Sequence, residues 1–332
     1  MMSIKEIAKL AGVSPATVSR VINQKKYVKP ERRERILALV RETGYVPNNA
    51  ARSMVLKRTF TIGIVIPDTF NMFQRQLFSI IEHDLEVYGY RTLFFFIKWE
   101  PESELNCLRK LKAENLDGII MIHEVIHPDF YAYLTHASLP VVLCTFSREQ
   151  LGFYSVHLDE EAAARTATEH LLGLGHRRIG LISGAHFSFP SQRAAGYRAA
   201  LEAAGIAYDD ARVASALAYC PEEGRTCMWE LLERGGDISA VFAITDELAI
   251  GAMRALYEAG LSAPRDISII GFDDIDIAAF MAPGLSTVRQ PIQEMGRKTA
   301  EIMSRLIAGD DCGACSIVFP HDLVIRGSCG AI

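Results

Sequence analysis

Hydrophobic positions follow two different rhythms along this chain. Over roughly the first 45 residues they recur at the spacing of one helix face and predict three short helices. The apolar faces comprise Ile4, Ile7, Ala8 and Leu10 in the first helix, Val18, Val21 and Ile22 in the second, and Ile36, Leu37 and Val40 in the third. From Phe60 onward, β-branched runs alternate with amphipathic helical segments, which is typical of parallel sheets with helices on both faces.

The same pattern places the strands and helices of the second region. Apolar, β-rich runs predict strands over 61–66, 91–97, 117–122, 140–144, 177–183, 239–245 and 266–273. Helical patterns predict helices over 71–88, 103–114, 160–174, 191–204, 222–235, 246–259 and 291–308. The predicted fold class is therefore an all-α N-terminal module followed by an α/β body.

Capping signals turn the first two helices into a helix-turn-helix. Ser3 and Glu6 have the spacing of a capping box, and Gly12 can end the first helix in a left-handed conformation. Ser14 is placed to cap the second helix, where Pro15 occupies a position that needs no amide proton. In a helix-turn-helix of this kind the second helix enters the DNA major groove.

Charge divides the chain at about the same place. Residues 1–60 carry 13 Lys or Arg against 4 Glu, a formal charge of +9, whereas the remaining residues carry −14. A basic module joined to an acidic body indicates that one end meets a polyanion and the other does not. A merely solvated basic face is the alternative, and the helix-turn-helix spacing in the same segment opposes it.

Composition favours a soluble globular protein. Of the 332 residues, 49% are hydrophobic and 23% are charged, which excludes disorder. The longest stretch without Asp, Glu, Lys or Arg, 130–147, contains Thr135, His136 and Pro140 and is a poor membrane span. The N-terminus lacks the apolar core of a signal peptide, and seven irregularly spaced cysteines indicate reduced thiols, so we expect a cytoplasmic protein.

The segment AKLAGVSPATVSRVIN, from Ala8 to Asn23, resembles the lactose/purine repressor family of bacterial transcription regulators. A third helix from Pro30 to about Thr43, the segment GYVPN at 44–48 and AARSM at 50–54 extend the resemblance. Lys29 stands where the family usually has a Ser or Thr cap, which implies a weaker start to the third helix.

By this resemblance the second helix reads the DNA. Pro15, Ala16 and Arg20 would face base edges, while Ser14, Thr17, Ser19 and Asn23 would mostly hold phosphates. The chemistry is suitable, because Arg can bond guanine bidentately and small residues can contact thymine methyl groups. Helix capping alone is the alternative for Ser14 and Thr17.

Residues 48–55 resemble the family's hinge helix, which folds when two copies meet over the central minor groove. Met54 stands where the family places a leucine wedge, and Arg52, Lys57 and Arg58 add positive charge nearby. So short a helix is marginal in isolation, and its folding would depend on DNA and dimerisation. An ordinary basic linker is the alternative.

The resemblance also organises the body into two lobes, as in type 1 periplasmic sugar-binding proteins. It implies a helix-turn-helix domain over 1–47, a hinge over 48–59 and an effector-binding and dimerisation domain over 60–332. The first lobe would comprise about 60–159 and 290–320, and the second about 160–289 and 321–332. A ligand would lie in the crevice at the carboxyl ends of the strands.

Side chains from both lobes are predicted to line this crevice. They are Phe73, Gln74, His123, Arg193, Tyr219, Thr245, Asp246 and Asp273. By the resemblance, Arg193 in the pattern RxxGxxxAL reaches ligand oxygens, and Asp273 in GFDD accepts from ligand hydroxyls. Aromatic faces with an Arg and an Asp suit a sugar or sugar derivative. Core packing is the alternative for Phe73 and Tyr219, and an inter-lobe ion pair is the alternative for Arg193 and Asp273.

Two motifs could instead indicate metal or redox chemistry. Residues 123–127 spell HExxH, but that motif works on a helix, and here it follows a strand and runs into Pro128. Cys312 and Cys315 form a lone CxxC, a weak signal without a second pair. Neither a phosphate-binding glycine loop nor a nucleophile elbow occurs, so we expect no enzyme, no cofactor and no metal site.

These patterns together predict a DNA-binding repressor that senses a small metabolite. We expect a homodimer, because two-fold proteins read near-palindromic operators. Two alternatives stay open at this point: a solute-binding protein without a regulatory role, and a corepressor-dependent regulator of the nucleobase type. The DNA-binding module and the absence of a signal peptide oppose the first.

Overall fold

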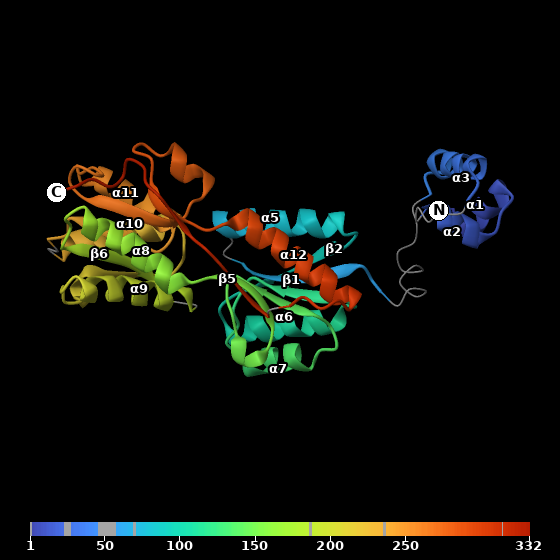
Figure 1. Ribbon diagram of the computed structural model, residues 1–332, viewed down its shortest axis with the longest axis horizontal. Helices are drawn as coiled ribbons and strands as arrows, with labels where there is room; N and C mark the ends of the chain where they lie inside the picture. The colour runs from blue at the N-terminus through green and yellow to red at the C-terminus, as the bar shows by residue number, and fades with distance from the viewer. Residues whose placement is uncertain are drawn as a thin grey trace. The chain divides into compact units, whose positions relative to one another are not determined.

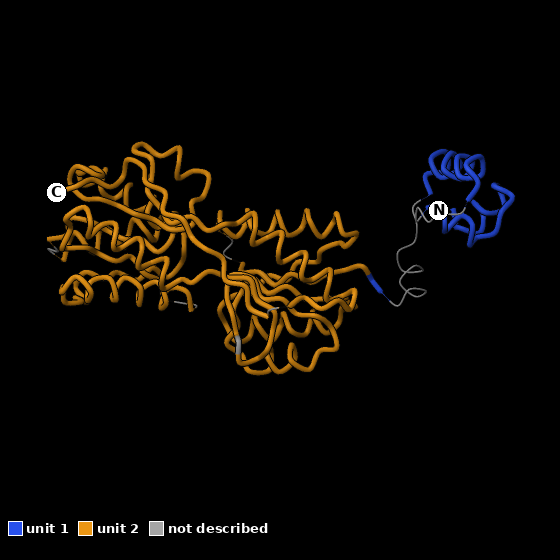
Figure 2. Tube along the Cα trace, in the orientation of Figure 1, with its two compact units in different colours: residues 1–59 blue, residues 60–332 orange. Residues whose placement is uncertain are grey.

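The computed structural model of the chain separates into two units, residues Met1–Thr59 and Phe60–Ile332 (Figure 2). It describes residues 2–22, 28–45, 58–68, 71–185, 188–234, 237–313 and 315–332. Two predicted DNA-contacting residues, Asn23 and Met54, and most of the predicted hinge lie outside the described residues.

The first unit contains the three predicted helices, α1 (Ile4–Ala11), α2 (Pro15–Ile22) and α3 (Pro30–Thr43). Their ends follow the predicted capping. Ser3 and Glu6 form the capping box, and Gly12 and Gly44 end α1 and α3 in left-handed conformations with φ of 68° and 61°. Lys29 makes no side-chain capping bond, as its chemistry implies.

The core of this unit is formed by residues that face one another across the helices. Its buried members are Ile7, Ala8, Ala11, Val18, Val21, Ile36 and Tyr45. Two predicted members are wrong, because Leu10 and Leu37 are 47% and 39% exposed. On α1 the inward position four residues after Ile7 belongs to Ala11, which leaves Leu10 at the edge of the helix face.

The second unit is built on two six-stranded sheets. We call the part built on the first sheet lobe A and the part built on the second lobe B. The lobe A sheet has the order β11-β5-β4-β3-β1-β2, and the lobe B sheet has the order β12-β10-β9-β8-β6-β7. The described strand pairs run parallel except β10 with β12, which is antiparallel.

The strands of lobe A are β1 (Thr61–Pro67), β2 (Arg91–Ile97), β3 (Gly118–Met121), β4 (Val141–Cys144), β5 (Tyr154–Leu158) and β11 (Ser316–Phe319). Those of lobe B are β6 (Ile179–Gly184), β7 (Val213–Ala216), β8 (Ala240–Ala243), β9 (Ser268–Asp273), β10 (Ser286–Arg289) and β12 (Asp322–Val324). The chain passes between the sheets three times, after β5, after β10 and between β11 and β12.

Helices cover both faces of each sheet. Lobe A has α5 (Met72–Val87), α6 (Pro101–Ala113), α7 (Pro128–His136) and α12 (Ile292–Ala308). In Figure 1, α5 and α12 lie together on one face of its sheet, and α6 and α7 lie on the other. Lobe B has α8 (Glu160–Gly173), α9 (Phe189–Ala203), α10 (Pro221–Glu233) and α11 (Asp246–Glu258). None of the helices in the described part of the chain could span a membrane.

All fourteen predicted body elements are present, and among the described residues the pattern missed five strands and helix α7. The strands β7, β10, β11 and β12 have four residues or fewer, and β5 mixes polar and apolar residues. Such segments lack the run of β-branched residues on which the prediction rests. Helix α7 begins at Pro128, the residue that argued against a helical HExxH.

Glycines let the lobe B helices pack with their backbones in contact. A Cβ on Gly196 of α9 would meet the backbone of Glu161 and Arg165 on α8. A Cβ on Gly251 of α11 would likewise meet Pro221 and Arg225 on α10. By contrast, Gly173 at the end of α8 is exposed and faces open space.

We therefore predict that Gly196→Ala destabilises the protein by about 1–3 kcal/mol or more, because the added methyl group forces α8 and α9 apart. Gly173→Ala is the matched control and should change stability by less than about 1 kcal/mol, in the stabilising direction if it changes at all. Urea denaturation of both variants measures the difference. Equal stability would show that the close helix contact is not limiting.

Candidate functional site

The outer surface of α2 presents the residues predicted to contact DNA. Val18 and Val21 are buried and anchor the helix in the core of the first unit. Ser14, Pro15, Ala16 and Arg20 are exposed, whereas Thr17 and Ser19 are half-buried. Further exposed basic residues in the described part of this unit are Lys5, Lys9, Lys29, Arg32, Arg35, Arg41 and Arg58. The helix thus has an accessible N-terminal end on a basic unit.

Helix capping, the alternative role considered for Ser14 and Thr17, is present at the start of α2. The Thr17 amide donates to the Ser14 Oγ at 3.2 Å, and the two hydroxyl oxygens lie 3.0 Å apart. Capping does not exclude a phosphate contact, because a hydroxyl has one donor and two acceptor sites.

In lobe B the guanidinium of Arg193 lies almost fully buried. Its Nε donates to Glu160 Oε2 at 2.7 Å, and its NH1 donates to the carbonyl of Ile244. The same nitrogen is 3.7 Å from Asp273 Oδ1, and the guanidinium lies over the Phe272 ring, 3.5 Å from its centroid. A buried charge needs such partners.

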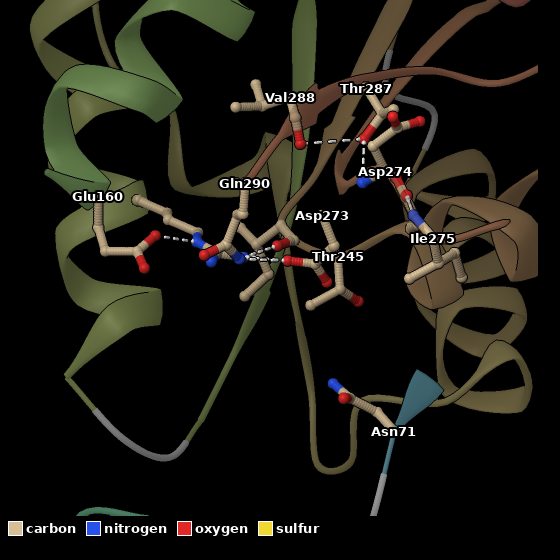
Figure 3. A network of polar contacts seen from close by, with 12 residues as sticks. Asn71, Glu160, Thr245, Asp273, Asp274, Ile275, Thr287, Val288 and Gln290 are labelled. Carbon is tan, nitrogen blue, oxygen red and sulfur yellow. Dashed lines mark hydrogen bonds and ion pairs between the residues drawn. The ribbon is translucent and has the colours of Figure 1, made fainter. Parts of the chain in front are cut away.

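Asp273 ends β9 with a positive φ of 120°, which directs its carboxylate toward this cluster. Gln290, just after β10, donates from Nε2 to Asp273 Oδ1 at 2.7 Å (Figure 3). Burial raises the pKa of Asp273 to about 7, and Arg193 and Gln290 oppose that rise.

The ion pair that was the alternative role of Arg193 and Asp273 is present, but it lies within one lobe and does not join the two. Both residues belong to lobe B, on α9 and β9. The sequence motif identifies Arg193 as a site residue. Which side chains contact its guanidinium depends on the order of the parallel strands. Glu160 and Gln290 were missed for the same reason, since they are far from both residues in sequence.

Thr245 and Asp246 begin α11 and mainly organise lobe B itself. The Thr245 side chain accepts from the Leu248 amide at 3.3 Å. Asp246 accepts from the Ile275 amide at 2.9 Å and from Thr287 Oγ1 at 2.6 Å, so both its oxygens are engaged. Burial, with Asp273 nearby, raises the pKa of Asp246 well above its ordinary range.

In lobe A, the side chains of Phe73 and Gln74 mainly stabilise the lobe itself. Phe73 is 6% exposed and packs in the core. Gln74 forms a capping box with Asn71 at the start of α5. His123 is 2% exposed, and its ring meets Trp99 edge-on at 5.7 Å. Burial lowers the pKa of His123 to about 3, so the ring is neutral at ordinary pH.

Among the described residues, two hydrogen bonds run from the start of a helix in one lobe to a carboxylate of the other lobe. The Met72 amide at the start of α5 donates to Glu247 Oε1 of α11 at 3.0 Å. The Ser188 amide before α9 donates to Glu124 Oε2 at 2.6 Å, and Glu124 also pairs with Arg148 at 3.4 Å. The acidic first turn of α11 was the available sequence signal for Glu247.

Tyr219 lies in lobe B, where its ring packs against Phe189 with 5.1 Å between ring centroids. It also lies directly over Gly184 at the end of β6, where a Cβ would meet the ring. Both aromatic residues thus stand near strand ends of lobe B.

The HExxH residues do not form a helix. His127 is the N-cap of α7, and its Nδ1 accepts from the Asp129 amide at 3.2 Å. Within the described ranges, no three His, Cys, Asp or Glu side chains are grouped to hold a metal ion. All seven cysteines, including Cys312 and Cys315, are free thiols.

A basic helix-turn-helix joined to a two-lobed α/β body, with buried polar groups at its strand ends, defines a DNA-binding transcription regulator. Residues 3–48 match the model of bacterial regulatory proteins of the lacI family, and residues 168–329 match a periplasmic binding protein-like domain. The transcriptional regulator DegA of Bacillus subtilis is 33% identical, over 98% of this chain and 97% of its own. The chain therefore belongs to the LacI family.

Two solved structures extend the likeness to the whole fold. The lac repressor dimer bound to operator and the anti-inducer ONPF is 26% identical with a TM-score of 0.85, covering 99% of both chains. The CelR–cellobiose complex is 29% identical with a TM-score of 0.75, covering 99% of this chain and 100% of that one. The alternative of a solute-binding protein without a regulatory role is wrong, because relatives matched over nearly the whole chain are transcription regulators.

The raised pKa of Asp273 predicts a pH-dependent stability. Folding raises this pKa from 3.8 to about 7, so the stability linked to the bound proton is complete below about pH 4 and lost as pH rises through about 7. Relative to wild type, Asp273→Asn should therefore gain about 1 kcal/mol or more between about pH 5 and pH 8.

Urea denaturation at both pH values measures this change. The exposed Asp276→Asn serves as control and should differ from wild type by the same amount at each pH. A difference for Asp273→Asn that does not vary with pH would place its pKa near the ordinary value.

Proposed function

We propose that this regulator is a cytoplasmic repressor that binds a near-palindromic operator as a homodimer and responds to a sugar held between its two lobes. The observation that carries the proposal is the pairing of an exposed α2 on a basic unit with the buried cluster of Arg193, Asp273 and Gln290 in a separate unit. One unit offers contacts to DNA, and the other offers polar groups at strand ends, where α/β folds bind ligands.

For the DNA we assign a helix-turn-helix domain to residues 1–47 and a hinge to residues 48–59. Arg20, Pro15 and Ala16 would contact base edges, and Met54 would form the minor-groove wedge. Ser14, Thr17, Ser19 and Asn23 would contact phosphates. The exposure of Arg20, Pro15 and Ala16 supports their role, because readout requires side chains that can reach the groove.

For the dimer we assign the body, residues 60–332, with apolar surface on lobe B as part of the contact. Phe280 and Tyr257 are 83% and 74% exposed. Tyr257 also lines a groove of about 480 Å³ with Met253 and Met281. Apolar surface of this kind typically marks an interface, and the similar lac repressor is a dimer on its operator.

For the effector we assign the region between lobe A, about 60–159 and 290–320, and lobe B, about 160–289 and 321–332. Asp273 and Gln290 provide oxygen acceptors there, and Phe189 and Tyr219 provide aromatic faces. A sugar fits this chemistry, and the similar CelR structure contains cellobiose. A nucleobase corepressor is less favoured, because the buried groups are mainly carboxylate and amide acceptors.

The proposed role of Arg20 predicts a loss of sequence-specific affinity. On an operator obtained by in vitro selection, Arg20→Ala should weaken binding by about 1–3 kcal/mol and leave binding to random DNA nearly unchanged. Fluorescence anisotropy at one fixed salt concentration measures both. Arg32→Ala, an exposed residue of α3, is the control and should act equally on both DNAs. An equal loss in Arg20→Ala would make Arg20 a phosphate contact.

The proposed effector site predicts a variant that binds operator but responds poorly. Asp273→Asn replaces a carboxylate that accepts through both oxygens with a group that has one acceptor and two donors. A sugar identified by thermal-shift screening should then act on the operator complex with a midpoint raised about tenfold or more. An unchanged midpoint would remove Asp273 from the effector site.

Asp273→Asn is a sharper test than Arg193→Ala. Removing Arg193 would leave Glu160 and Asp273 buried without their cation, a change that costs about 3–5 kcal/mol in comparable buried pairs. Loss of response in that variant could reflect unfolding of lobe B, whereas Asn keeps the shape of Asp. Operator affinity of Asp273→Asn, measured in parallel, shows that the fold is intact.

A further inference from the structure

We propose that the effector is an uncharged polyhydroxylated ligand and that the site selects against sugars carrying phosphate or carboxylate groups. The inference rests on the proposed function, since it names the chemical class of ligand that the region between the lobes accepts. Two features of the region between the lobes support the inference: how its positive groups are already paired, and which of its buried polar atoms lack a hydrogen-bond partner.

The guanidinium of Arg193 is already matched by the chain's own carboxylates. Its ion pairs are with Glu160 at 2.7 Å and with Asp273 at 3.7 Å. An anionic ligand placed on Arg193 would therefore approach two buried carboxylates at the same time. In a desolvated site, like charges that meet in this way oppose binding strongly.

Helix N-termini are the other common source of anion binding, and here they too are occupied. The starts of α8 and α11 carry Glu160 and Glu161, and Asp246 and Glu247, in their first turns. The starts of α5 and α9 are met from the opposite lobe, where Glu247 accepts from the Met72 amide and Glu124 accepts from the Ser188 amide. A phosphate would have to displace these carboxylates.

The ionisable side chains in these contacts include more carboxylates than guanidinium groups. Four carboxylates, Glu124, Glu160, Glu247 and Asp273, are set against two guanidinium groups, Arg148 and Arg193. Two further arginines of lobe B, Arg289 and Arg326, each bind Asp274 at 2.6 Å.

The pKa values agree with this balance. Burial raises the pKa of Asp273, and the negative charges of Glu160 and Glu247 raise it further. Burial also raises the pKa of Glu247, against the Met72 amide that lowers it. A site with positive charge to spare would hold both carboxylates ionised more readily.

The proposed site contains a hydrogen-bond acceptor that a ligand hydroxyl group could satisfy. Gln290 is 4% exposed, and its Oε1 is buried without a hydrogen-bond partner among the described residues. Its Nε2 is held by Asp273, which fixes the orientation of the amide. Figure 3 shows Asn71 of lobe A across from Thr245 and Asp273 of lobe B. Because a buried acceptor needs a donor, Gln290 indicates a ligand with hydroxyl groups.

Matched pairs of sugars test the inference on the full-length chain. Calorimetric titrations in a phosphate-free buffer compare glucose with glucose 6-phosphate, ribose with ribose 5-phosphate, and cellobiose with its 6-phosphate. At least one neutral sugar should bind, and its phosphorylated form should bind about tenfold or more weakly. A phosphorylated sugar that binds as tightly as its neutral partner overturns the inference, and so does a panel in which no neutral sugar binds.

A charge-neutral variant tests the electrostatic reason. Glu247→Gln keeps an acceptor for the Met72 amide but removes one negative charge, so the preference for the neutral sugar should fall about threefold or more. Glu169→Gln is the control, because Glu169 is exposed on α8 and pairs with Arg165. An unchanged preference in Glu247→Gln contradicts the electrostatic reason.

Operator binding, measured in the same preparations, separates this inference from the proposed function. A phosphorylated sugar that releases the operator at the same concentration as its neutral partner overturns the inference while upholding a sugar-responsive repressor. A chain that fails to bind any selected operator contradicts the proposed function, and the affinity ratio within each sugar pair still decides the ligand class.

Discussion

Arg193 places a full positive charge inside lobe B, and several of that lobe's buried polar groups are arranged around it. The guanidinium is 3% exposed, with Glu160, Asp273, the Ile244 carbonyl and the Phe272 ring around it. Such a cluster contributes little net stability, because desolvation offsets most of the attraction between the charges. Its effect is to fix geometry, since loss of Arg193 would leave Glu160 and Asp273 buried without a cation.

The contacts between the lobes differ in kind from this cluster. They are hydrogen bonds from the Met72 and Ser188 backbone amides to the Glu247 and Glu124 carboxylates, each at the start of a helix. Charge-assisted bonds of this type are stronger than neutral ones, yet two of them do not make a permanent interface. A ligand that contacts both lobes can therefore change the balance between arrangements, provided that it binds them unequally.

The sequence was most informative where a local signal sets the structure. The ends of α1 and α3 follow from Ser3, Gly12 and Gly44, whose effects depend only on their near neighbours. The positions of Arg193 and Asp273 in lobe B follow from motifs. Their partners were not predictable, because Glu160 and Gln290 lie far from both in sequence and meet them only through the strand order. The short strands were missed for a related reason, since neighbouring strands rather than their own residues hold them in the sheet.

Because the two units carry opposite net charge, DNA binding and ligand binding should depend on different interactions and respond differently to salt. The basic first unit can gain affinity for any DNA through phosphate contacts, and that gain falls as salt rises. The acidic second unit contributes no such attraction, and the carboxylates of Glu160 and Glu247 at its helix starts are expected to oppose anions at close range. We therefore expect DNA binding to depend on the first unit and the proposed hinge, and ligand binding to depend on short-range hydrogen bonds that salt screens much less. A change in ionic strength should thus act on the two sites unequally, and their coupling can be measured without one effect being mistaken for the other.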